Sequence, residues 1–404
     1  MFGRGELCEP CLIMAQKDDI VNRRTAGWMG IHRGHRSRPG EWLAEKFIFL
    51  TSLSAIITIF LIFLFVTREA LPIFLGRMNS AYVKQLIRPE DLDKTTPENL
   101  RQYLNLTPEE FKKTDRETLK LLLEVRAEAA AEQSHDKDAG VNTTAWRYLI
   151  FPYQWSGYDK PEFIWQPVGQ IQKYNIIPLL IGSLKVSLVA LLFAVPIAIG
   201  AAIYVSQLAH AKAKEILKPA IELLSGIPSV VLGFFALIVM ASFLQAVFGY
   251  PTRLNAFVAG LALALAVIPL VFSIAEDALT SVPGSYTQAA LALGSSRWQA
   301  ASQIVLPAAL PGVFAAIVLG FGRALGETMI VLMTSSASVV SWSILDSTRP
   351  ITATIAAELA EAVFGSHHFR ILFMLGSLLF AFTFVLNLIG EVVIHRLKQR
   401  LEGK

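Results

Sequence analysis

Long runs of uncharged, mostly apolar residues alternate with polar segments along most of the chain. The first run, Phe47 to Val66, holds 20 residues without a charge. At about 1.5 Å per residue, a helix of this length crosses the roughly 30 Å of hydrocarbon in a bilayer. The pattern predicts an all-α polytopic membrane protein with about six transmembrane helices, two of them long enough to tilt. The five further runs are Ile177 to Leu208, Ala220 to Phe248, Leu254 to Ile274, Ala308 to Met333 and Ile371 to Ile394.

Positive charges next to these runs predict an orientation. The first run is too long and too far along the chain for a cleaved secretory signal, so we expect it to stay as an anchor. Lysines and arginines gather on one side of the predicted spans, which predicts that this side is cytoplasmic. Both termini are then expected inside the cell, with the chain in the inner membrane. The charges are Arg33, Arg36, Arg38, Lys46, Lys212, Lys214, Lys218, Arg396, Lys398 and Arg400.

The predicted spans divide the chain into five parts. Residues 1–46 are expected to form a cytoplasmic tail, 47–66 the first transmembrane helix, 67–175 an extracytoplasmic insertion, 176–396 a transmembrane domain, and 397–404 a second cytoplasmic tail. Two Thr-Pro-Glu segments and an alanine-rich end predict small helices in the insertion. The aromatic residues that follow them are typical of a membrane interface.

The composition excludes several other classes of protein. Of 404 residues, 53% are hydrophobic and 17% charged, with a mean hydropathy of +0.49, which is too apolar for a soluble domain. The flanking charges account for the net charge of +4, so nucleic acid is not implied. Cys8 and Cys11 form a lone CxxC, and no phosphate-binding loop or His/Cys metal spacing occurs in the sequence. We therefore expect no catalytic residue, metal or cofactor on this chain, and solvated interface positions for His367 and His368.

The polar segment between the fourth and fifth runs carries residues at a recurring spacing. It reads Gln288-Ala289-Ala290, then Gly294 after three residues, then Ile304-Val305-Leu306-Pro307 after nine more. Alanine favours a helix, glycine can take the left-handed conformation that ends one, and either of the next two serines can cap another. Residues 285–307 are therefore predicted to form two short helices joined at a Gly elbow.

This spacing resembles the cytoplasmic coupling loop of ABC importer permeases, in which Glu-Ala-Ala, Gly and Ile-x-Leu-Pro recur at these intervals. The resemblance implies that the loop docks on a partner ATPase. Trp298 is the expected anchor and Arg297 a rim contact, because large aromatic and Arg side chains tend to dominate small interfaces. Gln288 stands where the family has Glu, so it keeps a hydrogen-bonding carbonyl but loses the charge-assisted part of the contact. The alternative is an ordinary amphipathic hairpin.

The fifth run contains two charges in the sequence Gly322-Arg323-Ala324-Leu325-Gly326-Glu327. An Arg in mid-span costs about 2.5–3.5 kcal/mol, so it should face protein, water or a ligand. Arg323 and Glu327 are four residues apart and are predicted on one helical face, with Gly322 and Gly326 allowing close approach of a neighbouring helix. Arg323 would then offer its charge and guanidinium donors to a passing anion, and Glu327 would orient the guanidinium or partly neutralise it. The alternative is a structural ion pair.

Two other residues within the spans have predicted roles. Pro228, two residues after Gly226, interrupts the predicted third helix and is a candidate gate or a packing kink. Lys185 lies near the predicted outer end of the second helix. We expect its ammonium to extend to the lipid headgroups, with attraction of an anion at the entrance as the alternative.

A closer resemblance appears in three segments, which are similar to the PstC-type permeases of phosphate ABC importers. The most specific segment is Gly-x-Gly-Arg-Ala-Leu-Gly-Glu-Thr-Met within Leu306 to Met329. The others are Gly226-Ile227-Pro228-Ser229-Val230 and the stretch from Ile351 to Glu361. The likeness covers roughly residues 165–396 and leaves the insertion and the N-terminal tail unexplained.

The resemblance implies a permease for inorganic phosphate with Arg323 and Glu327 on its translocation path. It also implies a PstA-type companion permease, a PstB-type ATPase dimer that uses the ATP, and a periplasmic PstS-type phosphate-binding protein. Three alternatives stay open. The chain could carry another oxyanion or a small polar nutrient, act as an ion-coupled secondary transporter, or serve as a membrane scaffold in which the insertion does the work.

Overall fold

The computed structural model describes residues 39–78, 97–104, 106, 108–133, 138, 141–169, 171–337 and 340–401. Most of the predicted N-terminal tail, including Cys8 and Cys11, lies outside the described residues. The contacts divide the chain into two units, Met1–Leu64 and Phe65–Lys404.

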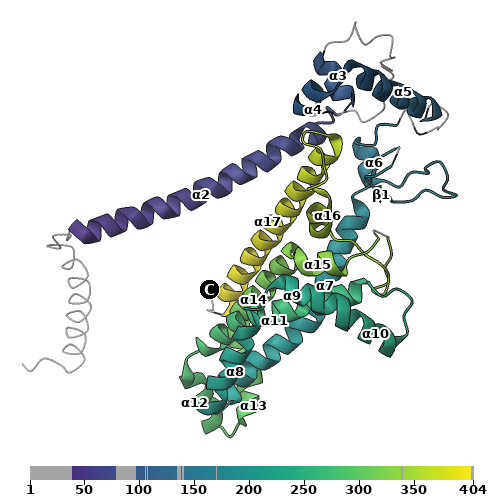
Figure 1. Ribbon diagram of the computed structural model, residues 1–404. Helices are drawn as coiled ribbons and strands as arrows, with labels where there is room; N and C mark the ends of the chain where they lie inside the picture. The colour runs from purple at the N-terminus through teal and green to yellow at the C-terminus, as the bar shows by residue number, and fades with distance from the viewer. Residues whose placement is uncertain are drawn as a thin grey trace, which may run out of the picture. The chain divides into compact units, whose positions relative to one another are not determined.

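The described part of the first unit belongs to one long helix, α2 (Pro39–Phe74; Figure 1). The helix begins eight residues before the predicted span, with proline in the first turn, where its missing N–H is not needed. Large apolar side chains along it are exposed, among them Phe47 at 67% and Ile56 at 65%. So much exposed apolar surface suits contact with lipid.

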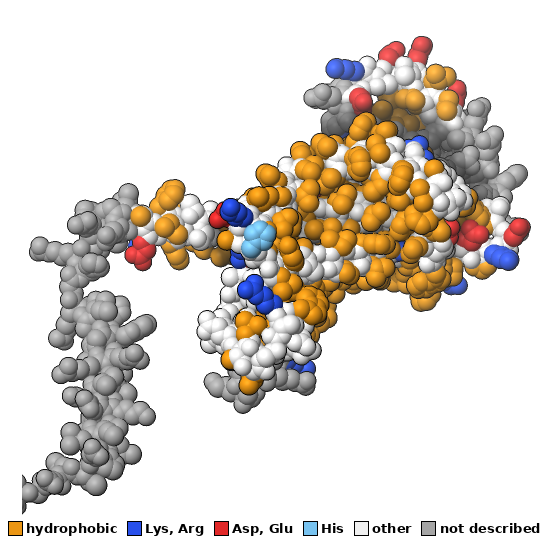
Figure 2. Space-filling model, turned by 90° about the horizontal axis from the view of Figure 1, so that it is seen from below, with side chains coloured by type: hydrophobic (Ala, Val, Ile, Leu, Met, Phe, Trp, Pro, Cys, Tyr) orange, Lys and Arg blue, Asp and Glu red, His pale blue; other side chains and the backbone are white. Residues whose placement is uncertain are grey.

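Six helices of the described chain are long and apolar enough to cross a membrane, which confirms the predicted number. Their bounds are Ala44–Phe74, Ile177–Leu208, Ser229–Phe248, Ala256–Thr280, Arg297–Gly326 and His367–Gln399. Figure 2 shows hydrophobic side chains over much of the visible face of the bundle, with few charges among them. Five of the six lie wholly in the second unit, which is therefore a helical membrane bundle.

Several of these spans are built from more than one element, because π-helical turns interrupt the regular hydrogen bonding. The elements are α7 (Ile177–Ile203) and η2 (Tyr204–Leu208); α9 (Ser229–Phe235), η3 (Ala236–Met240) and α10 (Ala241–Phe248); α11 (Ala256–Thr280); α13 (Arg297–Ala300), η4 (Ala301–Val305) and α14 (Leu306–Gly326); and α17 (His367–Leu401).

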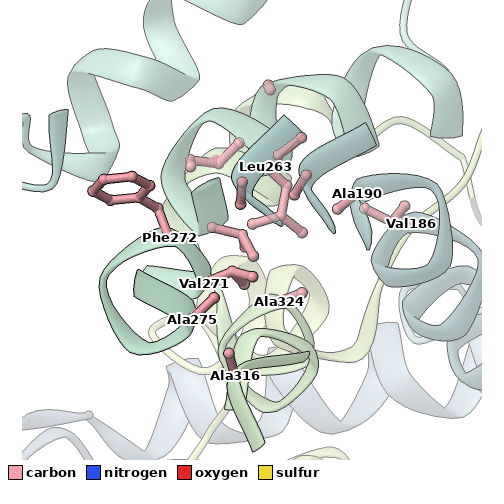
Figure 3. Packing of buried hydrophobic residues seen from close by; sticks show 14 of the residues in the cluster. Val186, Ala190, Leu263, Val271, Phe272, Ala275, Ala316 and Ala324 are labelled. Carbon is pink, nitrogen blue, oxygen red and sulfur yellow. The ribbon is translucent and has the colours of Figure 1, made fainter. Parts of the chain in front are cut away.

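The core of the bundle is made mainly of small residues between α7, α11 and α14 (Figure 3). On α7 four alanines at a spacing of four residues are completely buried: Ala190, Ala194, Ala198 and Ala202. A methyl group added at Gly260 of α11 would lie 2.5 Å from the side chain of Val189, so the two backbones are very close. Small residues allow this approach, and dispersion between closely packed helices replaces the hydrophobic effect in lipid.

Two of the predicted spans run across a break in the helical backbone. Ala220 belongs not to the third span but to a separate amphipathic helix, α8 (Ala211–Leu224), so the span starts only at Ser229. The fifth span does not reach Met333, because α14 ends at Gly326 and a short helix, α15 (Met329–Thr334), follows. In both cases apolar residues continue across a backbone break, and hydropathy alone does not detect it.

The segment between the first and second spans contains short helices. Two of them begin at the prolines of the Thr-Pro-Glu segments, and Leu100, Leu104, Leu119 and Leu123 form a small core. These helices are α3 (Pro97–Leu104), α4 (Pro108–Lys113), α5 (Arg116–Gln133) and α6 (Trp146–Ile150). Two short antiparallel strands follow, β1 (Trp165–Gln166) and β2 (Lys173–Tyr174), with Trp165 opposite Tyr174.

Candidate functional site

The polar segment between the fourth and fifth spans folds into two short helices. The first, α12 (Gly284–Ala292), ends just before Gly294, whose φ of 89° is the left-handed conformation that favours glycine. Before α13, Ser296 Oγ accepts from the backbone N–H of Gln299 at 3.3 Å, and Gln299 Oε1 accepts from that of Ser296 at 2.8 Å. This capping box satisfies two open donors. The predicted helix pair, Gly elbow and serine cap are confirmed.

Residues 284–300, which we call the knob, expose large apolar side chains. Leu293 is 89% exposed, Trp298 58% and Tyr286 51%, whereas Ala290 and Ala300 are buried at 2% and 0%. A protruding surface with exposed aromatic side chains on a buried base is typical of a protein contact. The sequence prediction included Trp298 but missed Leu293, although an apolar residue directly before a glycine elbow was a usable signal.

The other predicted docking residues fall into two groups. Gln288, Ala289 and Arg297 are exposed on the knob, whereas Leu306 and Pro307 are half-buried at the start of α14. Pro307 lies in the first turn of that helix, where a proline is tolerated. Because α13 continues through η4 into α14, a force on the knob acts directly on the helix that carries Arg323.

Arg323 and Glu327 do not share a helical face, and this part of the prediction is wrong. Glu327 has an extended backbone, with φ −69° and ψ 134°, directly after α14. The break is stabilised by Thr352, whose Oγ1 donates to the carbonyl oxygen of Glu327 at 2.8 Å. Thr352 lies on α16 (Ile351–Glu358) and so supplies a donor to a carbonyl that a helix end leaves open.

Arg323 is exposed, and it forms no ion pair or hydrogen bond with another residue in the described ranges. Glu327 is half-buried and likewise forms no ion pair within those ranges. The alternative of a structural Arg323–Glu327 pair therefore does not hold in this chain. A guanidinium in a membrane span must find partners, and they have to come from another molecule or from water.

An open groove of about 560 Å³ lies at the break between α14 and α15. Its lining combines two threonine hydroxyl groups with small or apolar side chains. The lining residues are Gly326, Thr328, Thr352, Ile355, Ala356, Leu359, Ala360 and Leu379. Gly326 and Thr328 are the neighbours of Glu327 in the chain, so the groove adjoins the segment that carries both predicted charges.

Gly322 and Gly326 do not provide a close helix contact within the chain. A methyl group at Gly326 would meet nothing within 4 Å, and one at Gly322 would meet only the Asn387 side chain at 3.7 Å. The close contact is at Gly320 instead, where a methyl group would lie 2.6 Å from Val271 of α11. Gly322 and Gly326 thus leave space on a face of α14 that α11 does not cover.

Pro228 does not bend a continuous helix. It is the residue before α9, with φ −58° and ψ 134°, and α8 has already ended at Leu224. Proline suits this position because a helix start needs no N–H from it. Pro228 therefore marks the start of α9, after α8 has ended, and not a kink within one helix.

The sequence of the bundle matches a known family. Residues 175–402 match the family described as "Binding-protein-dependent transport system inner membrane component". The chain belongs to this family. It is a multi-pass inner-membrane subunit of an ABC importer and not an enzyme, and its family works with an ATPase and a substrate-binding protein. The insertion before residue 175 lies outside the match.

Individual relatives of this permease are similar over most of their own length. A protein of Bacillus subtilis described as "Probable ABC transporter permease protein YqgH" is 33% identical, over 60% of this chain and 80% of its own. "Phosphate transport system permease protein PstC" of Pasteurella multocida is 34% identical, over 59% and 80%. A solved chain of the MetNI methionine ABC transporter shares 18% identity over 55% of this chain and 94% of its own, with a TM-score of 0.42.

Lys185 of the permease does not extend to the lipid headgroups, and this prediction is wrong. The residue is 9% exposed, and its Nζ donates to the backbone carbonyls of Ser341 and Ser343 at 3.1 and 3.0 Å. These carbonyls lie on the loop between α15 and α16, so Lys185 holds that loop against α7. Two hydrogen bonds compensate for burial of its charge.

A second buried charge, which the sequence analysis missed, is Glu276 on α11. Its side chain is 1% exposed and contacts two lysines of α8. Lys218 Nζ lies 2.6 Å from one carboxylate oxygen and Lys214 Nζ lies 3.2 Å from the other. Thr280 Oγ1 donates to the same carboxylate at 3.1 Å. The hydrogen bond to Glu276 raises the pKa of Lys218. Within the chain this charge is fully paired.

A third cluster gathers around Glu358 at the end of α16. Its carboxylate accepts from Trp165 Nε1 at 3.1 Å and pairs with Arg349 at 3.1 Å. His368 Nε2 lies 3.5 Å from it, and the His368 ring stacks on Tyr174. The predicted solvated position of His368 is therefore wrong. Burial raises the pKa of Glu358, and burial also raises that of the Tyr174 hydroxyl.

Among the residues that the structure describes, no group of three or more His, Cys, Asp or Glu side chains could hold a metal ion. The polar clusters of the permease instead pair carboxylates with lysine, arginine and indole donors. These contacts fix helices and loops relative to one another. Arg323 differs because the described chain offers it no partner.

Proposed function

We propose that this chain is the permease subunit of an ATP-driven importer of inorganic phosphate. Curated relatives at 34% and 31% identity carry the name phosphate transport system permease protein PstC. The observation that carries the proposal is the exposed, unpaired guanidinium of Arg323 in a membrane span. Phosphate carries one to two negative charges near neutral pH, and a guanidinium binds phosphate oxygens with two parallel hydrogen bonds.

One Arg can attract the anion without holding it too tightly to release, which conduction requires. Glu327 follows directly after the end of α14, next to Thr328, one of the two threonines that line the groove. Its carboxylate limits the net positive charge at this point of the path. We assign the substrate path to Arg323 and Glu327. We assign the gate to the α14–α15 break, which contains Glu327 and contacts α16 through Thr352.

The partners are a PstA-type companion permease, a PstB-type ATPase dimer and a PstS-type binding protein. In the proposed orientation both termini and the knob lie in the cytoplasm, as the flanking lysines and arginines favour. The ATPase then receives Trp298 and Leu293 in a groove, with Gln288 and Arg297 at the edge of the contact. The companion permease covers the face of α14 that carries Gly322 and Gly326. The permease itself binds no cofactor, and ATP is hydrolysed by the partner.

Reconstitution of the complete transporter in liposomes tests this function. We expect uptake of radioactive phosphate that requires external binding protein and internal ATP. Sulfate in tenfold excess should leave the uptake unchanged. Uptake that is blocked by sulfate would favour another oxyanion as substrate. Uptake that continues with a catalytically inactive ATPase would favour an ion-coupled transporter, and either result would contradict the proposal.

A further inference from the structure

The Glu276 cluster joins α8 to α11. Helix α8 lies at the same end of the bundle as α12 and α13 of the knob (Figure 1). Lys214 and Lys218 are four residues apart and therefore lie on one face of α8, turned toward α11. Glu276 is the group they share, because each lysine contacts a different oxygen of its carboxylate. Lys218 also lies 3.6 Å from Asp277, the next residue on α11. The contact is thus a two-point ionic clamp.

The clamp is the main polar attachment of α8 to the bundle. No residue of α8 is buried, and its apolar side chains are largely exposed, with Ile216 at 69% and Leu223 at 74%. Burial of a carboxylate carries a desolvation penalty that apolar packing of the same size would avoid. Replacing such a pair by apolar side chains is often neutral or stabilising, so stability alone does not explain the clamp.

The position of the clamp along the chain supplies that reason. Glu276 lies one turn before the end of α11, and only Ser281 to Pro283 separate this helix from α12 of the knob. On the other side, α8 ends at Leu224 and leads through Pro228 into α9. The clamp therefore connects the helix that enters the knob with the helix that enters the third span.

The third span in turn contacts the break next to Arg323. A methyl group at Gly233 of α9 would lie 3.1 Å from the carbonyl oxygen of Met329 and 3.2 Å from the Cα of Ile330. Both residues belong to α15, directly after Glu327 and Thr328. A displacement of α9 is thus felt at α15, because such closely packed backbones cannot move independently.

We propose that Glu276, Lys214 and Lys218 are positioning residues for transport, and that they transmit movement of the knob through α8 and α9 to the α14–α15 break. This inference rests on the proposed function. In this inference the clamp couples ATP hydrolysis to phosphate movement. The knob then acts on the path by two routes, directly through α13 into α14 and laterally through the clamp.

The test measures phosphate transported per ATP hydrolysed in the reconstituted transporter. Glu276→Gln removes the charge with little change in volume, and Lys212→Met is the control, since Lys212 is exposed on the same helix and forms no ion pair with a described residue. We expect Glu276→Gln to lower the ratio about tenfold, within the usual range of coupling between sites. Its ATP hydrolysis should stay within about twofold of the unaltered protein, and Lys212→Met should change neither quantity.

A second variant separates coupling from folding, because Glu276→Gln leaves two lysines without their partner. Glu276→Leu combined with Lys214→Met and Lys218→Met replaces the whole clamp by apolar side chains. We expect this protein to assemble in normal amounts and to show the same loss of coupling. A normal ratio of phosphate to ATP in this variant would overturn the inference, and so would failure to assemble, which would make the clamp purely structural.

The unaltered transporter distinguishes this inference from the proposed function. If it takes up no phosphate, the proposed function fails whatever the variants do. If it takes up phosphate and the clamp variants do so equally well per ATP, only the inference about the clamp fails.

Discussion

Glu276 and Arg323 are both charges in membrane spans, on two helices that pack against each other, and their surroundings are opposite. Glu276 is 1% exposed and has two lysine partners and a threonine donor. Arg323 is exposed and has no partner among the described residues. A charge that the chain pairs internally can hold or move helices. A charge that the chain leaves unpaired is suited to a group from outside.

The same difference separates the two faces of α14. On the face toward α11, Gly320 is in tight contact with Val271. On the face with Gly322 and Gly326, an added methyl group would meet at most one side chain within 4 Å. The side toward α11 is thus completed within the chain. On the other side α17 packs near Val318 and Gly322, so the open part lies around Gly326, where we expect the companion permease and the aqueous path.

The largest expected effect is on transport by Arg323→Ala. Without the guanidinium we expect phosphate uptake to fall about a hundredfold, because truncating one member of a charge pair costs about 2–5 kcal/mol. Co-purification with the ATPase should be unchanged. Arg323→Lys keeps the charge but loses the paired donors, so it should restore uptake only in part. Near-normal uptake by Arg323→Ala would contradict the account that Arg323, unlike Glu276, serves a group from outside the chain.

The next effect concerns the knob. Trp298→Ala should weaken binding of the ATPase about thirtyfold, since a central aromatic anchor is worth about 2 kcal/mol or more. Affinity is measured with the purified ATPase and the permease in nanodiscs. Trp342→Ala is the control, because Trp342 is also a highly exposed tryptophan, at 89%, but does not lie on the knob. If the unaltered permease, Trp298→Ala and Trp342→Ala bind the ATPase equally well, Trp298 is not the anchor.

A matched pair of glycine variants tests the two faces of α14. Gly320→Ala should destabilise the isolated permease by about 1–3 kcal/mol, because the methyl group meets Val271. Gly326→Ala should leave its thermal stability unchanged or slightly higher, since nothing lies within 4 Å. We expect it instead to weaken assembly with the companion permease. Thermal-shift and pull-down assays measure these two effects. A stable Gly320→Ala protein together with a destabilised Gly326→Ala protein that still assembles would contradict the assignment of the two faces.

The smallest effect is a pH dependence of stability from Glu358. Burial raises the pKa of this carboxyl in the folded protein, although Trp165 and Arg349 oppose the shift. A carboxyl with a raised folded pKa contributes stability that is present below its unfolded pKa of about 4.3 and is lost as pH rises through the folded value. The melting temperature of the permease in detergent should therefore fall as the pH rises from about 4.3 through the folded pKa of Glu358.

Glu358→Gln is the control for this prediction, because the amide oxygen still accepts from Trp165 but cannot titrate. Its melting temperature should lack this drop and should vary less with pH across the same interval. An identical pH profile in both proteins would show that Glu358 does not titrate in the way its burial implies.

The sequence was sufficient for the architecture but not for the charge pairs. Six apolar runs predicted six spans because a bilayer demands a minimum uncharged length. The Gly elbow and the serine cap followed from local backbone preferences. Lys218 and Glu276 are 58 residues apart, and Trp165 and Glu358 are 193 apart, so no local pattern brings them together.

The errors on Glu327 and Pro228 have one common cause. Helical periodicity was extended across residues whose backbone leaves the helix, and apolar composition continues on both sides of each break. At Glu327 the decisive partner is the hydroxyl of Thr352, which comes from a helix 25 residues further along the chain. Such tertiary partners override local propensity and cannot be identified from one sequence.

Thiol labelling tests most directly whether the guanidinium site faces water while the Glu276 site is closed. The two native cysteines, Cys8 and Cys11, are first replaced by serine. Arg323→Cys, Glu276→Cys and Ile56→Cys are then compared in the assembled transporter with a small hydrophilic thiol reagent. We predict rapid labelling at 323 and little at 276 or 56. A cysteine at 323 that reacts as slowly as the one at 56 would place Arg323 against lipid and contradict the account.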